Sequence, residues 1–332
     1  MNWKLMACAA QGRRHTAMQI PCQDKVRTVS TDGLWIGALS DGAGSASHSH
    51  YGAQCVVDTV CSLLSASFDT LFDMADADMA KAIIIEEIFL ALAKTAQSLG
   101  VTTQDLAATL LFVAVKDRRM LMGHIGDGVI CYSRGGMLRV ASRPTNGEFA
   151  NSTVFVTSRS AQAAMRLIKG DVSAISGFCL MSDGTAASLY DHRSGTPMPV
   201  LSRLLRLRAA MAARPLQQML EESFRESVIW GTQDDCSIVL MSPAASAAVL
   251  SDEELADLME LPEIPVRRLR WLRRCRTILT LAGNPRSLKA LSRAIHLKPK
   301  YAKRYIRKLL EYGLLVQTGT LYTAASVMKE RT

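Results

Sequence analysis

An apolar run that stops at an aspartate and passes straight into glycine constrains this chain most. The clearest copy is residues 34–44, LWIGALSDGAG. Apolar residues bounded by Asp-Gly are typical of a buried strand that ends at a tight turn, so we expect the Asp41 carboxylate at a strand end. The pattern recurs at Asp127 and Asp183, and it is reversed at Asp234, which precedes the apolar run 237–241.

These four strand ends would bring carboxylates together if the strands pack side by side. One Asp-Gly pair is common in turns, but four at the edges of apolar strands need another explanation. Converging carboxylates repel one another unless a cation lies among them. Oxygen ligands favour magnesium or manganese, and Gly42 leaves a carbonyl open to approach. The sequence therefore predicts a site for divalent metal ions.

Six short motifs follow one another between residues 7 and 242. They are Cys22-Gln23-Asp24, Ser40-Asp41-Gly42-Ala43-Gly44, Ala108-Thr109-Leu110, Gly126-Asp127-Gly128, Ser182-Asp183-Gly184 and Asp234-Asp235-Cys236-Ser237. This ordered set resembles the metal-dependent type 2C serine/threonine protein phosphatases, and most of all their small bacterial branch. The resemblance implies an α+β fold, a four-layer α/β/β/α sandwich, and hydrolysis of phosphoserine and phosphothreonine by a hydroxide that bridges two Mn²⁺ or Mg²⁺ ions.

The resemblance also implies roles for single residues. Asp41 would bridge the two ions, and Asp127 matches the position of a third, weaker ion. Asp235 is expected to orient the site without binding metal. The family's metal-ligand positions fall on Asp24, Asp41, Gly42, Asp127, Asp183 and Asp234.

Phosphate binding and proton donation are less clearly assigned by the motifs. The family's phosphate-binding arginine lies just before the Asp24 position, whereas Arg13 and Arg14 lie farther upstream here, and either could reach a phosphate as a bidentate donor. Ala43 stands where some members carry a histidine that acts as general acid. His48 and His50, downstream, are alternatives to solvent water.

A thiolate phosphatase is a rival interpretation. Cys8 and Arg14 have the Cys-x5-Arg spacing of such enzymes, in which a low-pKa cysteine attacks phosphorus. Ala7 stands where a histidine is usual, and no helical pattern follows to supply a dipole. The spacing alone therefore carries little weight.

Composition indicates an ordinary globular chain without export or membrane spanning. The eight cysteines include no Cys-x-x-Cys pair, which predicts reduced thiols in a cytoplasmic protein. The apolar stretch 5–10 is too short for a signal peptide, and the run 82–93 is interrupted by two glutamates.

Apolar spacing predicts the main elements of the first domain. Residues 1–10 and 26–29 are expected to be strands flanking a loop. An antiparallel meander is predicted for 109–115, 120–124, 129–133 and 137–140. Helices are predicted for 51–66, 79–99, 160–167, 199–213 and 216–226.

Charge separates a second module from the first. The whole net charge of +9 is carried by residues 251–332, and no acidic residue lies between Arg267 and Lys308. We therefore expect a phosphatase domain at 1–243, a linker with a short helix at 244–265 and a basic domain at 266–332.

Residues 266–332 resemble a winged helix. Helices are predicted at 287–295 and 299–312, followed by a hairpin of 314–316 and 321–323. Basic side chains interleaved with Tyr301 and Tyr305 would suit either a nucleic acid or an acidic protein surface. The candidates for this contact are Lys298, Lys300, Lys303, Arg304, Arg307 and Lys308.

Three hypotheses on function follow. The first is an active phosphatase that acts on a phosphorylated protein, such as a cognate serine/threonine kinase or its targets, with the tail for targeting or regulation. The second is a DNA-binding regulator with a phosphatase sensor domain. The third is a catalytically silent module that binds phosphoproteins, which loss of the aspartates would favour, and they are intact.

Overall fold

The computed structural model describes residues 2–31, 33–144, 153–261 and 263–327. Residue 1 of the first predicted strand lies outside them. The chain divides into two compact units. The larger unit comprises Leu5–Ser202 and Leu220–Met241, and the smaller unit comprises Met1–Lys4, Arg203–Met219 and Ser242–Thr332. The domain boundaries at 243 and 265 stay a prediction.

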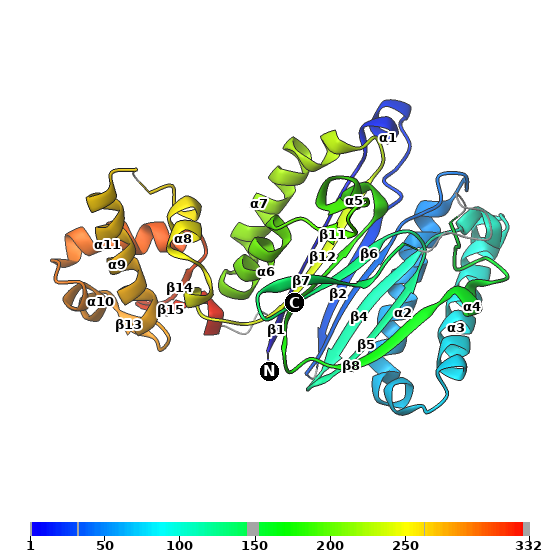
Figure 1. Cartoon of the computed structure of the whole chain (residues 1–332), viewed down its shortest axis with the longest axis horizontal. Coiled ribbons are helices and arrows are strands. Elements are labelled where there is room, and N and C mark those ends of the chain that lie inside the picture. Colours follow the sequence, from blue (N-terminus) through cyan, green and yellow to red (C-terminus); the bar gives the residue numbers. More distant parts are fainter. Residues whose placement is uncertain (1, 32, 145–152, 262, 328–332) are drawn as a thin grey trace. The chain divides into compact units, whose positions relative to one another are not determined.

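Two five-stranded sheets form the frame of the fold (Figure 1). The first sheet is fully antiparallel and has the order β2 (Lys25–Thr31), β3 (Leu34–Ser40), β4 (Leu110–Lys116), β5 (Arg119–Ile125), β8 (Arg166–Asp171). The second sheet has the order β1 (Trp3–Ala10), β12 (Cys236–Pro243), β9 (Ile175–Met181), β6 (Val129–Arg134), β7 (Met137–Ser142).

The two sheets pack closely face to face. A Cβ added at Gly37 in β3 would lie 2.7 Å from Val239 Cγ1 and 3.0 Å from Met241 Sδ in β12. Every residue of β3 is buried, as its unbroken apolar run predicts for a strand covered on both faces. Glycine at this position therefore lets the central strands of the two sheets approach each other.

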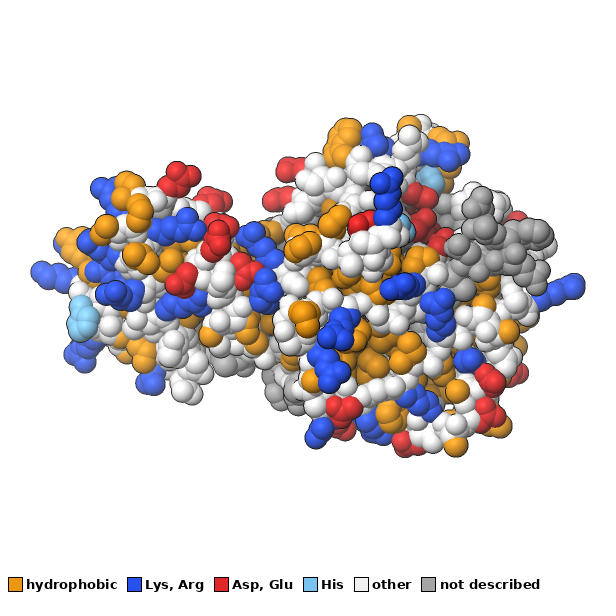
Figure 2. Space-filling model, in the orientation of Figure 1, with side chains coloured by type: hydrophobic (Ala, Val, Ile, Leu, Met, Phe, Trp, Pro, Cys, Tyr) orange, Lys and Arg blue, Asp and Glu red, His pale blue; other side chains and the backbone are white. Residues whose placement is uncertain are grey.

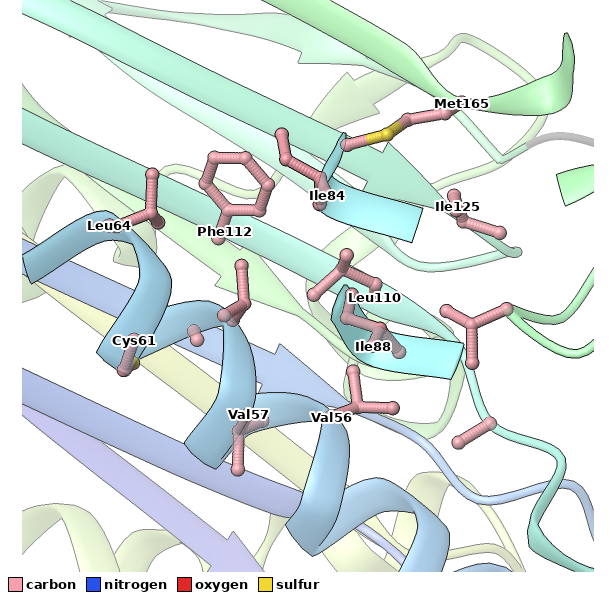
Figure 3. Packing of buried hydrophobic residues seen from close by; sticks show 14 of the residues in the cluster. Val56, Val57, Cys61, Leu64, Ile84, Ile88, Leu110, Phe112, Ile125 and Met165 are labelled. Atoms are coloured by element: carbon pink, nitrogen blue, oxygen red, sulfur yellow. The ribbon is translucent and has the colours of Figure 1, made fainter. Parts of the chain in front are cut away.

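Two long helices cover the outer face of the first sheet. They are α2 (Ser49–Asp73) and α3 (Ala77–Leu99), which is capped by Asp76 and ends at Gly100 in the left-handed region. Figure 3 shows their side chains packed against β4, with Val57, Ile84 and Phe112 in one core cluster. By length and composition, α2 could cross a membrane, but its apolar face belongs to this core.

Three sequence-based expectations were wrong, the first only in part. The four predicted strands and the antiparallel pairs β4–β5 and β6–β7 are present, but they do not form one meander, because β5 does not pair with β6: the chain crosses from one sheet to the other at residues 126–128. Residues 160–167 are not one helix, since α4 ends at Ala164 and β8 begins at Arg166 to pair with β5. Asp183 does not stand in a tight turn but begins α5 (Asp183–Leu189).

Shorter elements complete the larger unit. They are α1 (Arg13–Met18), η1 (Thr103–Leu106), α4 (Ala161–Ala164), β10 (Tyr190–Asp191), β11 (Thr196–Pro197) and η2 (Val228–Gly231). Helices α6 (Val200–Ala210) and α7 (Ala213–Glu226) straddle the two units. The fourth layer of the predicted sandwich therefore stays a prediction.

The C-terminal part of the smaller unit is a helical module with a small sheet. The strands have the order β13, β15, β14, and the β14–β15 hairpin turns at Gly319. The two predicted helices and the predicted hairpin are present, whereas α9 and β13 were not foreseen. The elements are η3 (Ala247–Val249), α8 (Asp252–Leu258), α9 (Pro265–Leu281), β13 (Arg286–Ser287), α10 (Leu288–Ala294), α11 (Pro299–Glu311), β14 (Leu315–Thr318), β15 (Leu321–Ala324) and η4 (Ala325–Val327).

A buried lysine connects the two ends of the chain within the smaller unit. Lys4 is 1% exposed, and its Nζ donates to the carbonyl oxygens of Met211 at 2.9 Å and Ala325 at 3.1 Å. Arg208, which is fully buried, donates to the same Met211 oxygen at 3.3 Å. Backbone acceptors thus contribute to holding two cations in the interior.

Candidate active site

Three carboxylates converge at one end of the two sheets. One oxygen each from Asp41, Asp127 and Asp183 lies within 4.8 Å of the other two. Asp41 follows β3, Asp127 lies in the crossing from β5 to β6, and Asp183 follows β9 and begins α5. Both sheets therefore contribute to this acidic cluster.

The Ala108-Thr109 motif fixes the backbone of Asp41. The amide of Asp41 donates to Thr109 Oγ1 at 2.9 Å, and the amide of Thr109 donates to the Asp41 carbonyl at 2.8 Å. The hydroxyl of Ser40 donates to the Thr109 carbonyl at 2.6 Å. These bonds hold the carboxylate at the strand end.

Gly42 lies where the chain passes against the start of α2. Its amide donates to the Gln23 carbonyl at 3.3 Å, and it forms an isolated bridge with Ala108. A Cβ at Gly42 would lie 2.8 Å from both Cβ and the carbonyl oxygen of Ser49. No larger residue fits without moving the backbone. The role of its carbonyl as a metal ligand stays a prediction.

Asp24 is buried, and its charge acts on Asp41 of the cluster. It is 1% exposed, and neither carboxylate oxygen has a donor in hydrogen-bonding geometry among the described residues. Burial raises the pKa of Asp24 to about 7, opposed by the nearby hydroxyls of Ser237 and Ser182. The Ser237 hydroxyl also lacks a partner in that described set.

Burial and mutual repulsion act on the other carboxylates as well. Burial, then Asp24 and Asp183, raises the pKa of Asp41 well above its ordinary value. Burial, then Asp127, raises the pKa of Asp183 to about 6. Acids clustered in this way, with orphaned buried oxygens near them, fit a divalent cation with oxygen ligands.

Asp234 and Asp235 differ sharply in their surroundings. The side chain of Asp234 is 54% exposed, and its charge acts on Asp41 and Asp183. Asp235 is buried and accepts from the amides of Gly12 at 2.6 Å and Gln23 at 2.5 Å. The contacts of Asp235 therefore fix the position of the segment 12–24, whereas the side chain of Asp234 is exposed next to the cluster.

His15 was not assigned a role from the sequence, yet it contacts this acidic pair. Its Nδ1 lies 2.9 Å from Asp235 Oδ2, although the two atoms are not aligned for a hydrogen bond. Its Nε2 lies 3.9 Å from Asp234 Oδ1. More than 200 residues separate these partners in the chain, so no local pattern could have indicated the contact.

Thr153 is a second residue that sequence reasoning missed. Its Oγ1 donates to Asp127 Oδ2 at 2.5 Å. A threonine in a segment without periodic pattern gives no signal in the sequence. The contact occupies one oxygen of Asp127.

The two candidate phosphate-binding arginines behave differently. Arg13 donates to the carbonyls of Thr232, at 3.1 Å, and Ile229, at 3.3 Å, and its Cζ lies 4.9 Å from the Trp230 ring centroid. Arg14 is exposed, and no side-chain partner for it is found in the described part of the chain. Its amide donates to the Gln233 carbonyl at 3.1 Å, directly beside Asp234.

The alternative candidates are not part of this cluster. His48 Nδ1 lies 2.8 Å from Ser47 Oγ, and the His50 ring lies 4.2 Å from that of Tyr51. Cys8 is buried in β1, and burial raises the pKa of its thiol to about 12. The thiolate interpretation is therefore wrong, because a thiol that stays protonated at neutral pH is no nucleophile.

The basic residues predicted to bind a partner line α11. Lys298, Lys300, Lys303, Arg304 and Arg307 are exposed, and Lys308 is half-buried. Tyr301 is 51% exposed, with Lys300 Nζ 4.9 Å from its ring centroid. Tyr305, expected among the surface residues, is fully buried, since it packs on Trp271 of α9 with ring centroids 4.1 Å apart.

The sequence is similar to those of known protein phosphatases. A family model described as protein phosphatase 2C matches residues 11–225. Serine/threonine-protein phosphatase 3 of Escherichia coli (strain K12) is 26% identical over 169 residues, which are 48% of this chain and 65% of that relative. The chain thus spans about 65% of the length of the curated relative it matches.

One solved bacterial phosphatase shares the fold. Serine/threonine phosphatase Stp1 from Staphylococcus aureus has a TM-score of 0.51 at 13% identity, covering 73% of this chain and 95% of that one. The catalytic domain of PstP, solved with two manganese ions, has a TM-score of 0.48 at 16% identity, covering 72% and 97%. The Stp1 likeness, at this identity, shows the fold alone.

Proposed function

The chain belongs to the protein phosphatase 2C family of serine/threonine phosphatases, whose family model matches more than half of it, and we propose that it hydrolyses phosphoserine and phosphothreonine in proteins with metal-activated water. The observation that carries this proposal is the convergence of three carboxylate oxygens within 4.8 Å. Burial of two further unpaired oxygens on Asp24 supports it. No side-chain nucleophile is needed.

The metal would be manganese or magnesium, bound as two ions with a third, weaker one at Asp127. Asp41, which lies within reach of both Asp127 and Asp183, would hold metal together with Asp183, Asp24, Asp234 and the Gly42 carbonyl. Such ions, when bound, supply Lewis acidity and lower the pKa of water. Asp235 positions the loop that carries Asp24 through its bonds to two backbone amides.

Phosphate binding is assigned to Arg14 in preference to Arg13. The guanidinium of Arg13 is engaged with the carbonyls of residues 229–232. Arg14 is exposed next to the Gln233–Asp234 backbone. Its planar fork can bind two phosphoryl oxygens at once and orient the substrate beside the carboxylates.

The C-terminal module is proposed to be a winged-helix domain that chooses the target. The order of α9, α10 and α11 followed by the β14–β15 hairpin supports this. Its exposed basic residues would meet an acidic partner, either a nucleic acid or the surface of a protein such as the cognate kinase or its targets. A cytoplasmic location stays a prediction.

Hydrolysis of a phosphothreonine peptide and of p-nitrophenyl phosphate, with EDTA or with added manganese, tests the proposed activity. We expect no turnover in EDTA and full recovery with manganese, since every candidate ligand is an oxygen. The Asp41→Asn variant, which keeps the side-chain volume, is the matched control and should stay inactive with manganese. Full activity in EDTA contradicts the metal mechanism, and peptide binding without turnover favours the silent module.

A further inference from the structure

Two arginines from different helices donate to one tyrosine oxygen in the smaller unit. Arg274 of α9 donates from Nη1 to Tyr305 Oη at 2.6 Å, and Arg304 of α11 donates from Nη2 to the same oxygen at 3.1 Å. The Cζ of Arg304 also lies 5.5 Å from the Trp271 ring centroid and 4.9 Å from that of Tyr305. Two like charges are thus held close together in fixed orientations.

Neither of these guanidinium groups has a carboxylate partner within the described residues. Other arginines of the module do, for Arg276 lies 2.9 Å from Asp252 and Arg268 lies 3.3 Å from Asp257. A guanidinium carries five N–H donors, and each of the two gives one to the tyrosine. Most of their donors, and all of their charge, therefore stay available to an anion.

The tyrosine holds the two arginines in place. Tyr305 is fully buried, and its oxygen accepts from both arginines. The tyrosine oxygen therefore orients the two guanidinium groups toward one place, where their remaining donors match the several oxygens of a phosphate group.

We call Arg274, Arg304 and Tyr305 the arginine clamp. Its surroundings are basic on both sides. Lys300, Lys303 and Arg307 are exposed on α11 next to Arg304. A hollow of about 710 Å³ beside Arg274 is lined by Arg270, Arg273 and His296, together with Val266 and Leu269, and none of its lining residues in the described structure is acidic. Figure 2 shows several Lys and Arg side chains on the visible side of the module.

We propose that Arg274 and Arg304, oriented by Tyr305, bind a phosphate group without hydrolysing it, and that the phosphate belongs to the backbone of a nucleic acid. A single phosphorylated side chain would fill the clamp and leave the flanking cations unmatched. A nucleic-acid strand carries one negative charge about every 3.4 Å along its axis, so it matches a row of cations. The inference rests on the proposed targeting role of the module, not on catalysis.

Binding of a labelled 20-base-pair duplex to the full chain, followed by fluorescence anisotropy over a range of salt concentrations, tests the clamp. We expect Arg274→Gln and Arg304→Gln each to weaken binding roughly tenfold or more. Each should lower the log–log salt slope by about one, and the double variant should also lower it by only about one, because both arginines contact one phosphate. Tyr305→Phe should weaken binding about threefold with an unchanged slope.

The matched control is Arg293→Gln, which removes one exposed positive charge from α10. If Arg293→Gln weakens duplex binding as much as Arg304→Gln does, or if the salt slope of the double variant falls by two units, the arginines act by unspecific attraction and not as a clamp on one phosphate. Absence of duplex binding at low salt, or arginine-dependent binding of a doubly phosphorylated peptide alone, overturns the nucleic-acid assignment.

Hydrolysis of p-nitrophenyl phosphate by the same variants separates this inference from the proposed function. It should equal that of the unaltered protein, since none of these residues belongs to the acidic cluster. An inactive unaltered protein that still binds the duplex would refute only the phosphatase. Equal melting temperatures, measured in parallel, show that the Tyr305→Phe variant is folded.

Discussion

The ammonium group of Lys4 donates to the carbonyl oxygen of Ala325, so a residue of the first strand is hydrogen-bonded to one that lies 321 positions later. The same ammonium donates to Met211, at the break between α6 and α7. A buried lysine with backbone acceptors is stable only while those acceptors stay in place. Within the smaller unit, Lys4 is thus held by a residue of the C-terminal module.

Replacing Lys4 by methionine should destabilise the protein. The variant leaves two buried carbonyl oxygens without this donor, which costs about 1–3 kcal/mol of unfolding free energy. Urea denaturation measures the change, and Lys289→Met, at an exposed position of α10, serves as the control. Equal stability of Lys4→Met and the unaltered protein would contradict the importance of the two bonds.

Asp41→Asn and Asp183→Asn should abolish turnover without unfolding the protein. Loss of a ligand that stabilises transition-state charge by several kcal/mol lowers kcat by about 10²-fold or more. Without metal, both variants should be at least as stable as the unaltered protein, because one repelling charge is gone. Steady-state kinetics and metal-free thermal unfolding check the two claims, and a marked fall in melting temperature would mark these residues as structural.

The metal-free protein should lose stability as pH rises from about 4 to about 7. The pKa of Asp24 is raised to about 7 and that of Asp183 to about 6 in the folded state, above the ordinary 3.8. The folded state therefore binds more protons than the unfolded state in this window, and that contribution is lost as pH rises. Urea unfolding in EDTA across this range measures it.

Two controls identify the source of this pH dependence. Asp24→Asn should flatten the curve, because the amide does not titrate. Saturating manganese should also flatten it, since a cation compensates the ionised carboxylates. A stability curve that rises with pH in the unaltered metal-free protein would refute the assignment.

Arg14→Gln should reduce kcat/KM for a phosphopeptide far more than Arg13→Gln. A charge-assisted pair of hydrogen bonds to phosphate is worth about 1.5–3 kcal/mol, or roughly 10–10²-fold in rate. Arg13 instead donates to carbonyls of the 229–232 segment, so its loss should act on stability and change kcat/KM less than about threefold. Arg14→Lys, which keeps the charge without the fork, should be intermediate, and a reversed order of the two arginines would contradict the assignment.

The acidic residues could be found from the sequence because their signal is local. Asp41 and Asp183 each end an apolar run, and a strand end is recognisable from neighbouring residues alone. The same local reading missed the crossing at residues 126–128, since three residues with two glycines suit a hairpin as well as a step between sheets. Only the partner strands distinguish the two.

Contacts between distant segments had no sequence signal at all. The Ala-rich residues 161–164 favour a helix, but β8 directly after them is fixed by pairing with β5. His15 with Asp235, and Arg274 with Tyr305, meet because separate elements pack together. Tyr305 was expected outside because its charged neighbours dominate the pattern, yet Trp271 covers it.

The acidic cluster draws Asp41 from one sheet and Asp183 from the other, so a cation that binds both can do so only while the sheets are stacked. Its binding free energy then also opposes their separation, by about 2.7 kcal/mol at a free concentration a hundredfold above Kd. In cells that are short of metal, more of this protein would accordingly be degraded by proteases. Metal shortage would then lower the amount of the protein as well as the turnover of each molecule.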